Sequence, residues 1–200
     1  MTLAPNMAYK VLVDGRSCHG GTMDWLLPTL NDDGTYTPGD WMLVGGKLIL
    51  CQRALHLTDQ PAGWYVEGAQ CWLAEYRGDT VGGLTGTWDS KVGVREARLI
   101  APVAWDEVGV WSEGGHSLPA GVGRASGSAS VRAYGSASVS AYDSASVRAY
   151  DSASVTASDS ASVTSDRWHS ASAEVALSSL AAHIDRRGGN LVLRSAGGAA

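Results

Sequence analysis

Apolar and polar residues alternate strictly in the second half of the chain, in a pattern that repeats every eight residues. The unit Ser-Ala-Ser-Val-Arg-Ala-Tyr-Gly of residues 128–135 returns with small changes in residues 136–143, 144–151 and 152–159, and in a weaker copy from Ser160. Within each unit Ala and Val occupy every second position, which is the period of a strand with one buried face. The eighth residue is Gly or Asp, and both favour turns. Each unit therefore predicts a short strand followed by a corner.

Stacked units predict a β-solenoid, because one unit cannot bury its apolar face alone. The predicted core contains only Ala and Val, so the two faces of each coil must lie close together. Two units make a coil of 16 residues, and the units present then give about two and a half coils at roughly 4.8 Å each. A flexible Ser-rich linker is the alternative, but a linker has no reason to keep Val and Tyr in phase.

The first half of the chain is built from different side chains, since seven of the eight Trp lie at or before Trp111. Its apolar runs predict strands at residues 9–13, 41–44, 47–50, 71–76 and 90–100. We expect residues 41–50 to form a hairpin that turns at Gly45 and Gly46, a favoured two-residue turn. Thr58 or Asp59 is expected to cap a short helix.

The eight-residue phase is lost after Trp168. Apolar residues there share one helical face, which predicts a capping helix over residues 171–187. Val175 and Leu177 also alternate, so one more solenoid strand is the competing prediction. A last strand is expected at residues 190–194.

These patterns together predict a mainly β protein, with a small β-rich (α+β) N-terminal domain followed by a short octapeptide-repeat β-solenoid and a C-terminal cap, helix or extra strand. The predicted bounds are residues 1–110 for the N-terminal domain, 111–127 for a linker or first irregular coil, 128–167 for the solenoid and 168–200 for the cap and tail.

Charge and composition exclude some classes of function. The net charge is −5 and no basic run exceeds Arg186-Arg187, which argues against nucleic-acid binding. No segment approaches the ~20 apolar residues of a membrane span, and residues 1–10 lack the features of a signal peptide. An odd count of three Cys favours reduced thiols. We therefore expect a protein of a bacterial cytoplasm, or one associated with a virion.

Three Cys and one His form the candidate metal set: Cys18, Cys51, His56 and Cys71. Cys and His are the usual zinc ligands, and four of them close a tetrahedral site. No pair has the close spacing of a zinc ribbon, and Cys within apolar strands behaves as a small hydrophobic residue. We therefore expect buried, inert cysteines and no metal or cofactor, with structural zinc as the alternative.

His19 and Glu75 form the candidate catalytic set. A His after a strand and a later Glu resemble ADP-ribosyltransferase-like sites, in which a His helps to hold the nicotinamide cofactor and a Glu orients the ribose. The resemblance implies an enzyme that acts on host proteins. The alternative is a His in a turn and a Glu on an exposed strand. The remaining histidines, His116, His169 and His183, are predicted at the surface.

The predicted outer surface of the solenoid carries candidate binding residues: Arg132, Arg148, Tyr134, Tyr142 and Tyr150. Tyr and Arg are enriched in protein interfaces, and stacked Tyr rings that stabilise the coils are the alternative. If consecutive units lie on opposite faces, Tyr134 stacks on Tyr150 and Tyr142 lies opposite. A regular Ser/Thr surface also resembles ice-binding solenoids, but the Arg and Tyr side chains interrupt it.

The chain resembles a family of uncharacterised phage and actinobacterial proteins that have a small β-rich N-terminal module followed by Ala/Ser/Val octapeptide repeats. The repeats carry the resemblance, together with residues 51–57, Pro61, Ala74-Glu75 and residues 89–92. Ala54 departs from the family pattern, which has Gly there. The resemblance implies a phage or prophage origin and no reaction.

We therefore predict a non-enzymatic protein-binding or assembly protein, with the solenoid as a rigid spacer or interaction surface. Self-association through open solenoid edges is a further possibility, because unpaired strand edges attract other strands. An ADP-ribosyltransferase-like enzyme is the alternative.

Overall fold

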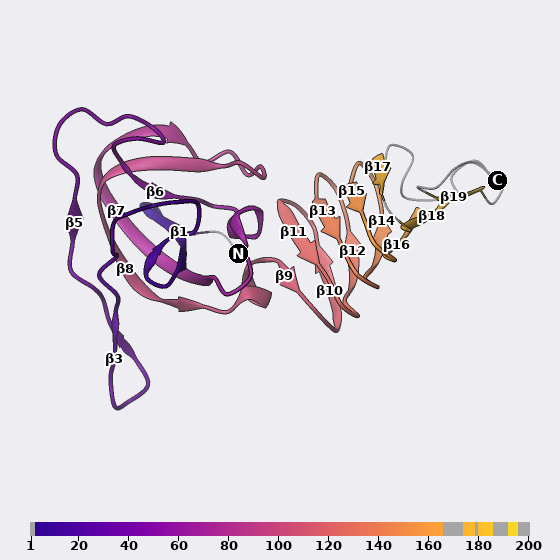
Figure 1. Cartoon of the computed structure of the whole chain (residues 1–200), viewed down its shortest axis with the longest axis horizontal. Coiled ribbons are helices and arrows are strands. Elements are labelled where there is room, and N and C mark those ends of the chain that lie inside the picture. The colour runs from indigo at the N-terminus through magenta and orange to yellow at the C-terminus, as the bar shows by residue number, and fades with distance from the viewer. Residues whose placement is uncertain (1–2, 166–173, 179, 186–191, 196–200) are drawn as a thin grey trace. The chain divides into compact units, whose positions relative to one another are not determined.

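The structure is a computed structural model that describes residues 3–165, 174–178, 180–185 and 192–195 (Figure 1). The chain divides into two units, Met1–Val108 and Gly109–Ala200, which we call the head and the solenoid. No helix in the described part of the chain is long and apolar enough to cross a membrane.

The head is built around one long antiparallel strand pair, Gln70–Gly83 with Lys91–Val103. The strands of this unit are β1 (Met7–Val13), β2 (Arg16–Ser17), β3 (Thr29–Leu30), β4 (Tyr36–Thr37), β5 (Met42–Leu43), β6 (Leu55–Leu57), β7 (Gln70–Gly83) and β8 (Lys91–Val103). Two short 3-10 helices are η1 (Pro61–Trp64) and η2 (Trp105–Val108). Strand β1 pairs with β7, while β5 and β6 pair with β8.

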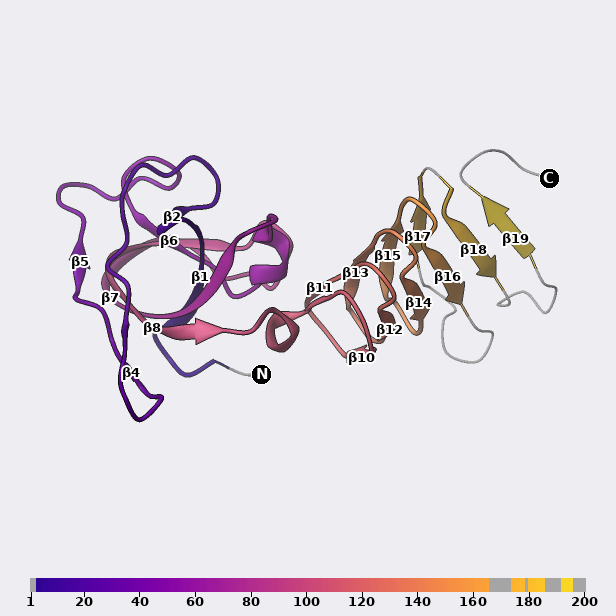
Figure 2. The same ribbon diagram turned by 60° about the horizontal axis from the view of Figure 1, so that its bottom comes forward.

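The main sheet of the head closes into a small barrel (Figure 2). Thr58 directly follows β6, and it exchanges two backbone hydrogen bonds of 2.7 and 2.9 Å with Tyr9 of β1. The path from β1 through β7, β8 and β6 therefore returns to β1. Residues from these strands and from the intervening loops form one apolar core: Ala8, Leu12, Trp25, Met42, Leu55, Leu57, Trp72, Ala74, Val92, Val94, Ala97 and Leu99.

The predicted hairpin at residues 41–50 is wrong, because long-range pairing replaces it. Strand β5 pairs with β8, through Met42 opposite Ala97. The Arg95 guanidinium donates hydrogen bonds to the carbonyls of Val44 and Gly46, which holds the Gly-Gly segment against β8. The irregularity predicted near Arg95 is confirmed: the register of β7 on β8 shifts between Arg77 and Thr80, opposite this residue.

The solenoid consists of two parallel sheets. Its strands are β9 (Val110–Trp111), β10 (Gly115–Leu118), β11 (Val122–Ala125), β12 (Ser130–Ala133), β13 (Ser138–Ala141), β14 (Ser146–Ala149), β15 (Ser154–Ala157), β16 (Ser162–Ser165), β17 (Glu174–Leu177), β18 (Ala182–Asp185) and β19 (Val192–Ser195). The even-numbered strands from β10 to β18 form one sheet, with β19 added antiparallel at its end. The odd-numbered strands from β9 to β17 form the other (Figure 1).

The coil length of 16 residues is confirmed by the pairing. Ser130 pairs with Ser146 in one sheet, and Ser138 pairs with Ser154 in the other. Val and Ala at alternate positions point between the sheets and form a core of small buried side chains. Ser and Arg or Thr at the intervening positions face outward, as the alternation predicts.

The geometry of the corners explains why each unit ends in Gly or Asp and begins with Ser. Residue eight has a left-handed backbone, with φ of 54° at Asp143 and 53° at Gly135, a conformation that Gly and Asp tolerate best. The Asp143 carboxylate accepts a hydrogen bond of 3.1 Å from the Gly127 backbone N–H, one coil earlier. The Ser144 hydroxyl donates one of 2.8 Å to the Gly127 carbonyl. Each corner is therefore joined to the preceding coil by side chains as well as by backbone.

Trp111 fills the first coil of the solenoid. Its side chain is 6% exposed, and its ring stacks on His116 with centroids 4.9 Å apart. Gly123 leaves the space for it, because a Cβ at residue 123 would lie 2.8 Å from the rings of Trp111 and from the Leu118 methyl. Val139 occupies the equivalent position of the next coil.

Gly123→Val is therefore expected to destabilise the solenoid, although it restores the residue of the repeat. Overpacking of this kind costs about 1–3 kcal/mol, which thermal unfolding would detect as a lower melting temperature. In a Trp111→Ala background the same substitution is expected to be neutral or stabilising. Equal melting temperatures for Gly123→Val and the parent chain would contradict this account.

The predicted capping helix at residues 171–187 is wrong for its described part, and the competing strand prediction holds. Strand β17 stacks on β15 with Leu177 opposite Ala157, and β18 stacks on β16. Ser154 pairs with Glu174, so this last coil is four residues longer than the 16 of the others. The parallel edges of β15 and β16 select strands here over the helical pattern. Residues 171–173, 179 and 186–187 lie outside the described part.

A buried polar cluster closes the described solenoid core. His183 and Asp185 take the inward positions of β18, with 2% and 7% of their surface exposed. The Ser165 hydroxyl and the His183 Nε2 atom are 2.8 Å apart and share a hydrogen bond. The surface position predicted for His183 is therefore wrong. Ser165 and His183 take the inward positions that Ala149 and Val163 hold one coil earlier, so the core of Ala and Val ends at this cluster.

Candidate functional site

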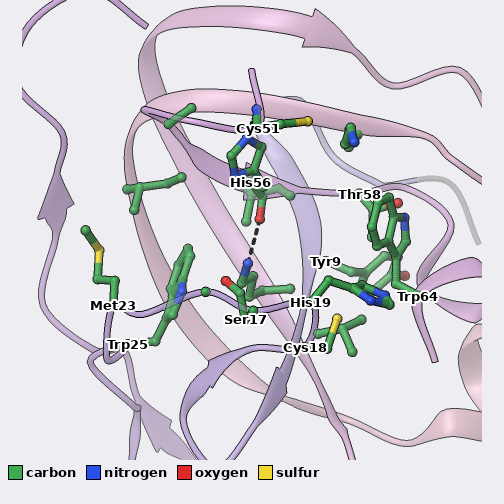
Figure 3. A pocket seen from close by; sticks show the side chains of 18 of the residues that line it. Tyr9, Ser17, Cys18, His19, Met23, Trp25, Cys51, His56, Thr58 and Trp64 are labelled. Atoms are coloured by element: carbon green, nitrogen blue, oxygen red, sulfur yellow. Dashed lines mark hydrogen bonds between the residues drawn. The ribbon is translucent and has the colours of Figure 1, made fainter. Parts of the chain in front are cut away.

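The head contains a pocket of about 410 Å³ beside β1 (Figure 3). Its walls come from β1, the segment after β2, the turn before β6 and β6 itself, helix η1 and the start of β8. In Figure 3, Cys51 and His56 lie on one side of the pocket, Met23 and Trp25 on a second, and His19 and Trp64 on a third. Pockets of a few hundred Å³ are of the size that binds small molecules.

Lys10 is a buried cation in this pocket. It lies on β1 between Ala8 and Leu12, two core residues, and alternation places all three side chains on the same face. Only 5% of its surface is exposed. Its Nζ atom donates a 3.0 Å hydrogen bond to the His56 carbonyl and lies 4.8 Å from the centroid of the Trp25 ring. Burial lowers the pKa of Lys10 from its ordinary 10.5 to about 8.

His56 is held as a neutral imidazole. Its Nε2 atom accepts a 2.8 Å hydrogen bond from the backbone N–H of Cys51, so its proton lies on Nδ1. Burial lowers the pKa of His56, and the positive charges of Lys10 and Lys91 lower it further. The tight turn at Cys51, with φ of 64°, directs this N–H at the ring.

His19 and Lys91 lie around Trp64, on the third side of the pocket. The His19 ring meets the Trp64 ring edge-on, with centroids 5.2 Å apart, and the Lys91 Nζ lies 5.3 Å from the Trp64 centroid. The indole N–H of Trp64 donates to the Ser90 carbonyl at 3.2 Å, which fixes the ring. Cations over an aromatic face are attracted by its electrons.

The candidate zinc set is not assembled. Cys18, Cys51 and His56 line the pocket, but Cys71 does not: it is buried on β7 and its pKa is raised to about 12 by burial. Among the described residues no three His, Cys, Asp or Glu side chains come together as metal ligands. Burial also raises the pKa of the Cys18 thiol, so this thiol is protonated near neutral pH.

The candidate catalytic set is also separated. His19 lines the pocket, whereas Glu75 does not. The Glu75 carboxylate accepts a 2.8 Å hydrogen bond from Arg98 of the neighbouring strand. The structure therefore provides no single site at which His19 and Glu75 act on one cofactor.

The solenoid brings the candidate binding residues together in two groups. Arg132 and Arg148 are directly opposite each other on adjacent strands, and both are exposed. Tyr134 and Tyr150 stack with centroids 4.7 Å apart and ring planes 7° apart. We call these four residues the Arg–Tyr face. Tyr142 belongs to the other sheet, where the Arg124 guanidinium lies 4.5 Å from its ring centroid.

The sequence did indicate the stacking of Tyr134 on Tyr150 but not the pocket. The missed residues are Lys10, Trp25, Trp64 and Lys91. A signal for Lys10 was present, because a charged residue two positions from Leu12 in an apolar strand must share its buried face. Nothing in the local pattern indicated that two Trp residues far apart in the chain would share the same pocket.

Comparison of the chain with protein-family models, with curated proteins and with solved structures found no match. The phage and actinobacterial resemblance of the repeats therefore stays a prediction from sequence.

Proposed function

We propose that the protein is a non-enzymatic binding or assembly protein whose solenoid presents the Arg–Tyr face to a protein partner. The observation that carries this proposal is the register of the even-numbered sheet, which aligns Arg132 with Arg148 and stacks Tyr134 on Tyr150. Arg and Tyr supply a large share of the binding energy in many interfaces. Paired guanidinium groups favour a partner that presents carboxylates.

The rest of the solenoid supports a role as a rigid support for this face. Each coil is joined to the next by parallel pairing in both sheets and by the Asp and Ser bonds at the corners. The core side chains are short, with little rotamer freedom to lose. A face on such a support loses little conformational entropy on binding, which favours affinity. A phage or prophage origin is proposed on the sequence resemblance alone.

The test moves the Arg pair from one sheet to the other. Arg132→Ser with Arg148→Ser introduces a residue that the repeat already carries at Ser140, so the fold is expected to persist. A second variant adds Ser140→Arg and Thr156→Arg, which are opposite each other in the odd-numbered sheet and restore the charge. We expect the parent chain to capture a stoichiometric partner from a bacterial host lysate, and both variants to lose at least about 90% of it.

Retention of the partner by the charge-restored variant would contradict the Arg–Tyr face as the binding surface. A chain that ends at residue 108 provides the control for the head. Capture of the same partner by this shorter chain would place the interaction in the head instead.

A further inference from the structure

The pocket of the head holds a buried positive charge that no carboxylate balances. Lys10 forms no ion pair with any described residue, and none of the described residues that line the pocket is Asp or Glu. Lys91 adds a second cation to the pocket, on the side of Trp64. An ammonium removed from water without a counter-ion is strongly disfavoured. A pocket that retains such a group is therefore prepared for an anion.

The neighbouring ionisable groups do not supply this anion. The Cys18 thiol is kept protonated by burial, which raises its pKa, and the His56 imidazole is neutral because its pKa is lowered. One of the three N–H donors of Lys10 is used by the His56 carbonyl. The ammonium therefore has donors left for a ligand oxygen.

The remaining walls favour a flat apolar body. Trp25 lies beneath Lys10, Trp64 lies on the facing side (Figure 3), and Met23 lies beside Trp25. Aromatic rings stack on Trp faces, and the Met thioether adapts to irregular shapes. The cavity of about 410 Å³ accommodates one or two fused rings with an acid group.

We propose that the head pocket binds a small organic anion, with its acid group on the Nζ atom of Lys10 and its aromatic body against Trp25 and Trp64. Lys91 and His19 border the same space; Lys91 adds positive potential, and both side chains carry N–H donors. This site is separate from the Arg–Tyr face of the solenoid, and either proposal can fail while the other stands.

A pair of fluorescent probes tests the proposal. The first is 1-anilinonaphthalene-8-sulfonate, an aromatic anion, and the second is N-phenyl-1-naphthylamine, the same aromatic body without the sulfonate. We expect the parent chain to bind the anion at one site and at least about tenfold more tightly than the neutral probe, as a charge-assisted hydrogen bond provides. Equal affinity for the two probes would overturn the proposal without any variant.

Lys10→Met then tests the residue itself. We expect it to weaken the anion at least about tenfold and to change the affinity for the neutral probe by less than about twofold, since Met keeps the apolar stem. Lys47→Met, at an exposed lysine outside the pocket, is the matched control and is expected to change neither affinity. Unchanged anion affinity in Lys10→Met, or an equal loss for Lys47→Met, would overturn the proposal.

Discussion

Duplication of one complete coil, residues 136–151, is expected to give a folded solenoid with a higher melting temperature. Strands pair with partners 16 residues away, as Ser138 does with Ser154, so the added coil enters with its core and corner residues in register. Stability in such arrays grows with each nearest-neighbour interface. Every additional 1 kcal/mol is expected to raise the melting temperature by roughly 4–8 °C in a unit of this size. Circular dichroism during heating measures this change.

A single residue inserted in a strand is expected to have the opposite effect. An Ala placed between Val147 and Arg148 moves Arg148 into the inward position of Ala149, which is fully buried. A slip of one residue reverses the two faces of the strand, and an unpaired guanidinium among Ala and Val costs several kcal/mol. We expect the melting transition of the solenoid to disappear.

The head supplies the internal control for both variants. Six of the eight Trp lie before residue 109, so the near-ultraviolet circular dichroism of the chain reports mainly on this unit and is expected to persist. An inserted Ala that leaves the solenoid transition unchanged would show that the alternation does not determine the fold. A duplicated coil that lowers the melting temperature would show that the coils are not equivalent.

The solenoid was predictable because the short sequence repeat determines which residues of successive coils pair. Val recurs at the same position of every unit, so a coil of 16 residues places Val131 opposite Val147. The end of the array was not predictable in the same way. Leu177 and Leu180 fit one helical face, and the decision for a strand came from the open edge of β15, onto which Leu177 stacks opposite Ala157.

The head was less predictable because its pairings are long-range. The Gly45-Gly46 pair favours a local hairpin. Arg95, 49 residues after Gly46, donates a hydrogen bond to the Gly46 carbonyl and holds this segment against β8 instead. The candidate sites failed for a related reason. Cys71 and Glu75 lie on β7 and do not line the pocket, which sequence order alone does not reveal.

Lys10→Met is expected to stabilise the head at pH 7 by about 3 kcal/mol. The pKa of Lys10 falls from its ordinary 10.5 to about 8 in the fold because burial disfavours the charged form. This shift of 10.5 − 8 = 2.5 corresponds to about 3 kcal/mol at 1.36 kcal/mol for each pKa unit. Methionine fills the same space without a charge to desolvate.

The sign of the pH dependence follows from the lowered pKa. Between pH 8 and pH 10.5 the unfolded chain keeps the Lys10 proton while the folded chain loses it, so the stability contributed by this group rises with pH in that window. Below pH 8 the full cost is present, and above pH 10.5 it is absent. The advantage of Lys10→Met is therefore expected to shrink from about 3 kcal/mol at pH 7 towards zero near pH 11.

The difference between the two proteins isolates Lys10 from the other groups that titrate at high pH. Tyr9 and Cys71 have raised pKa values in the fold, so each lowers stability in alkali, but both are present in each protein and cancel. Urea unfolding of both chains at several pH values measures the difference, with Lys47→Met expected to show none. A Lys10→Met chain less stable than the parent at every pH would mean that the ammonium supports the fold.

Replacement of Lys10 is expected to change stability and anion binding in opposite directions. When a residue that only supports the fold is replaced, the protein becomes less stable, and its affinity for the ligand falls as a consequence. Lys10 is expected to behave in the reverse way, since its replacement removes an unbalanced buried charge and also removes the donor for the anion. A more stable protein that no longer binds the anionic probe is the signature of a residue retained for its function.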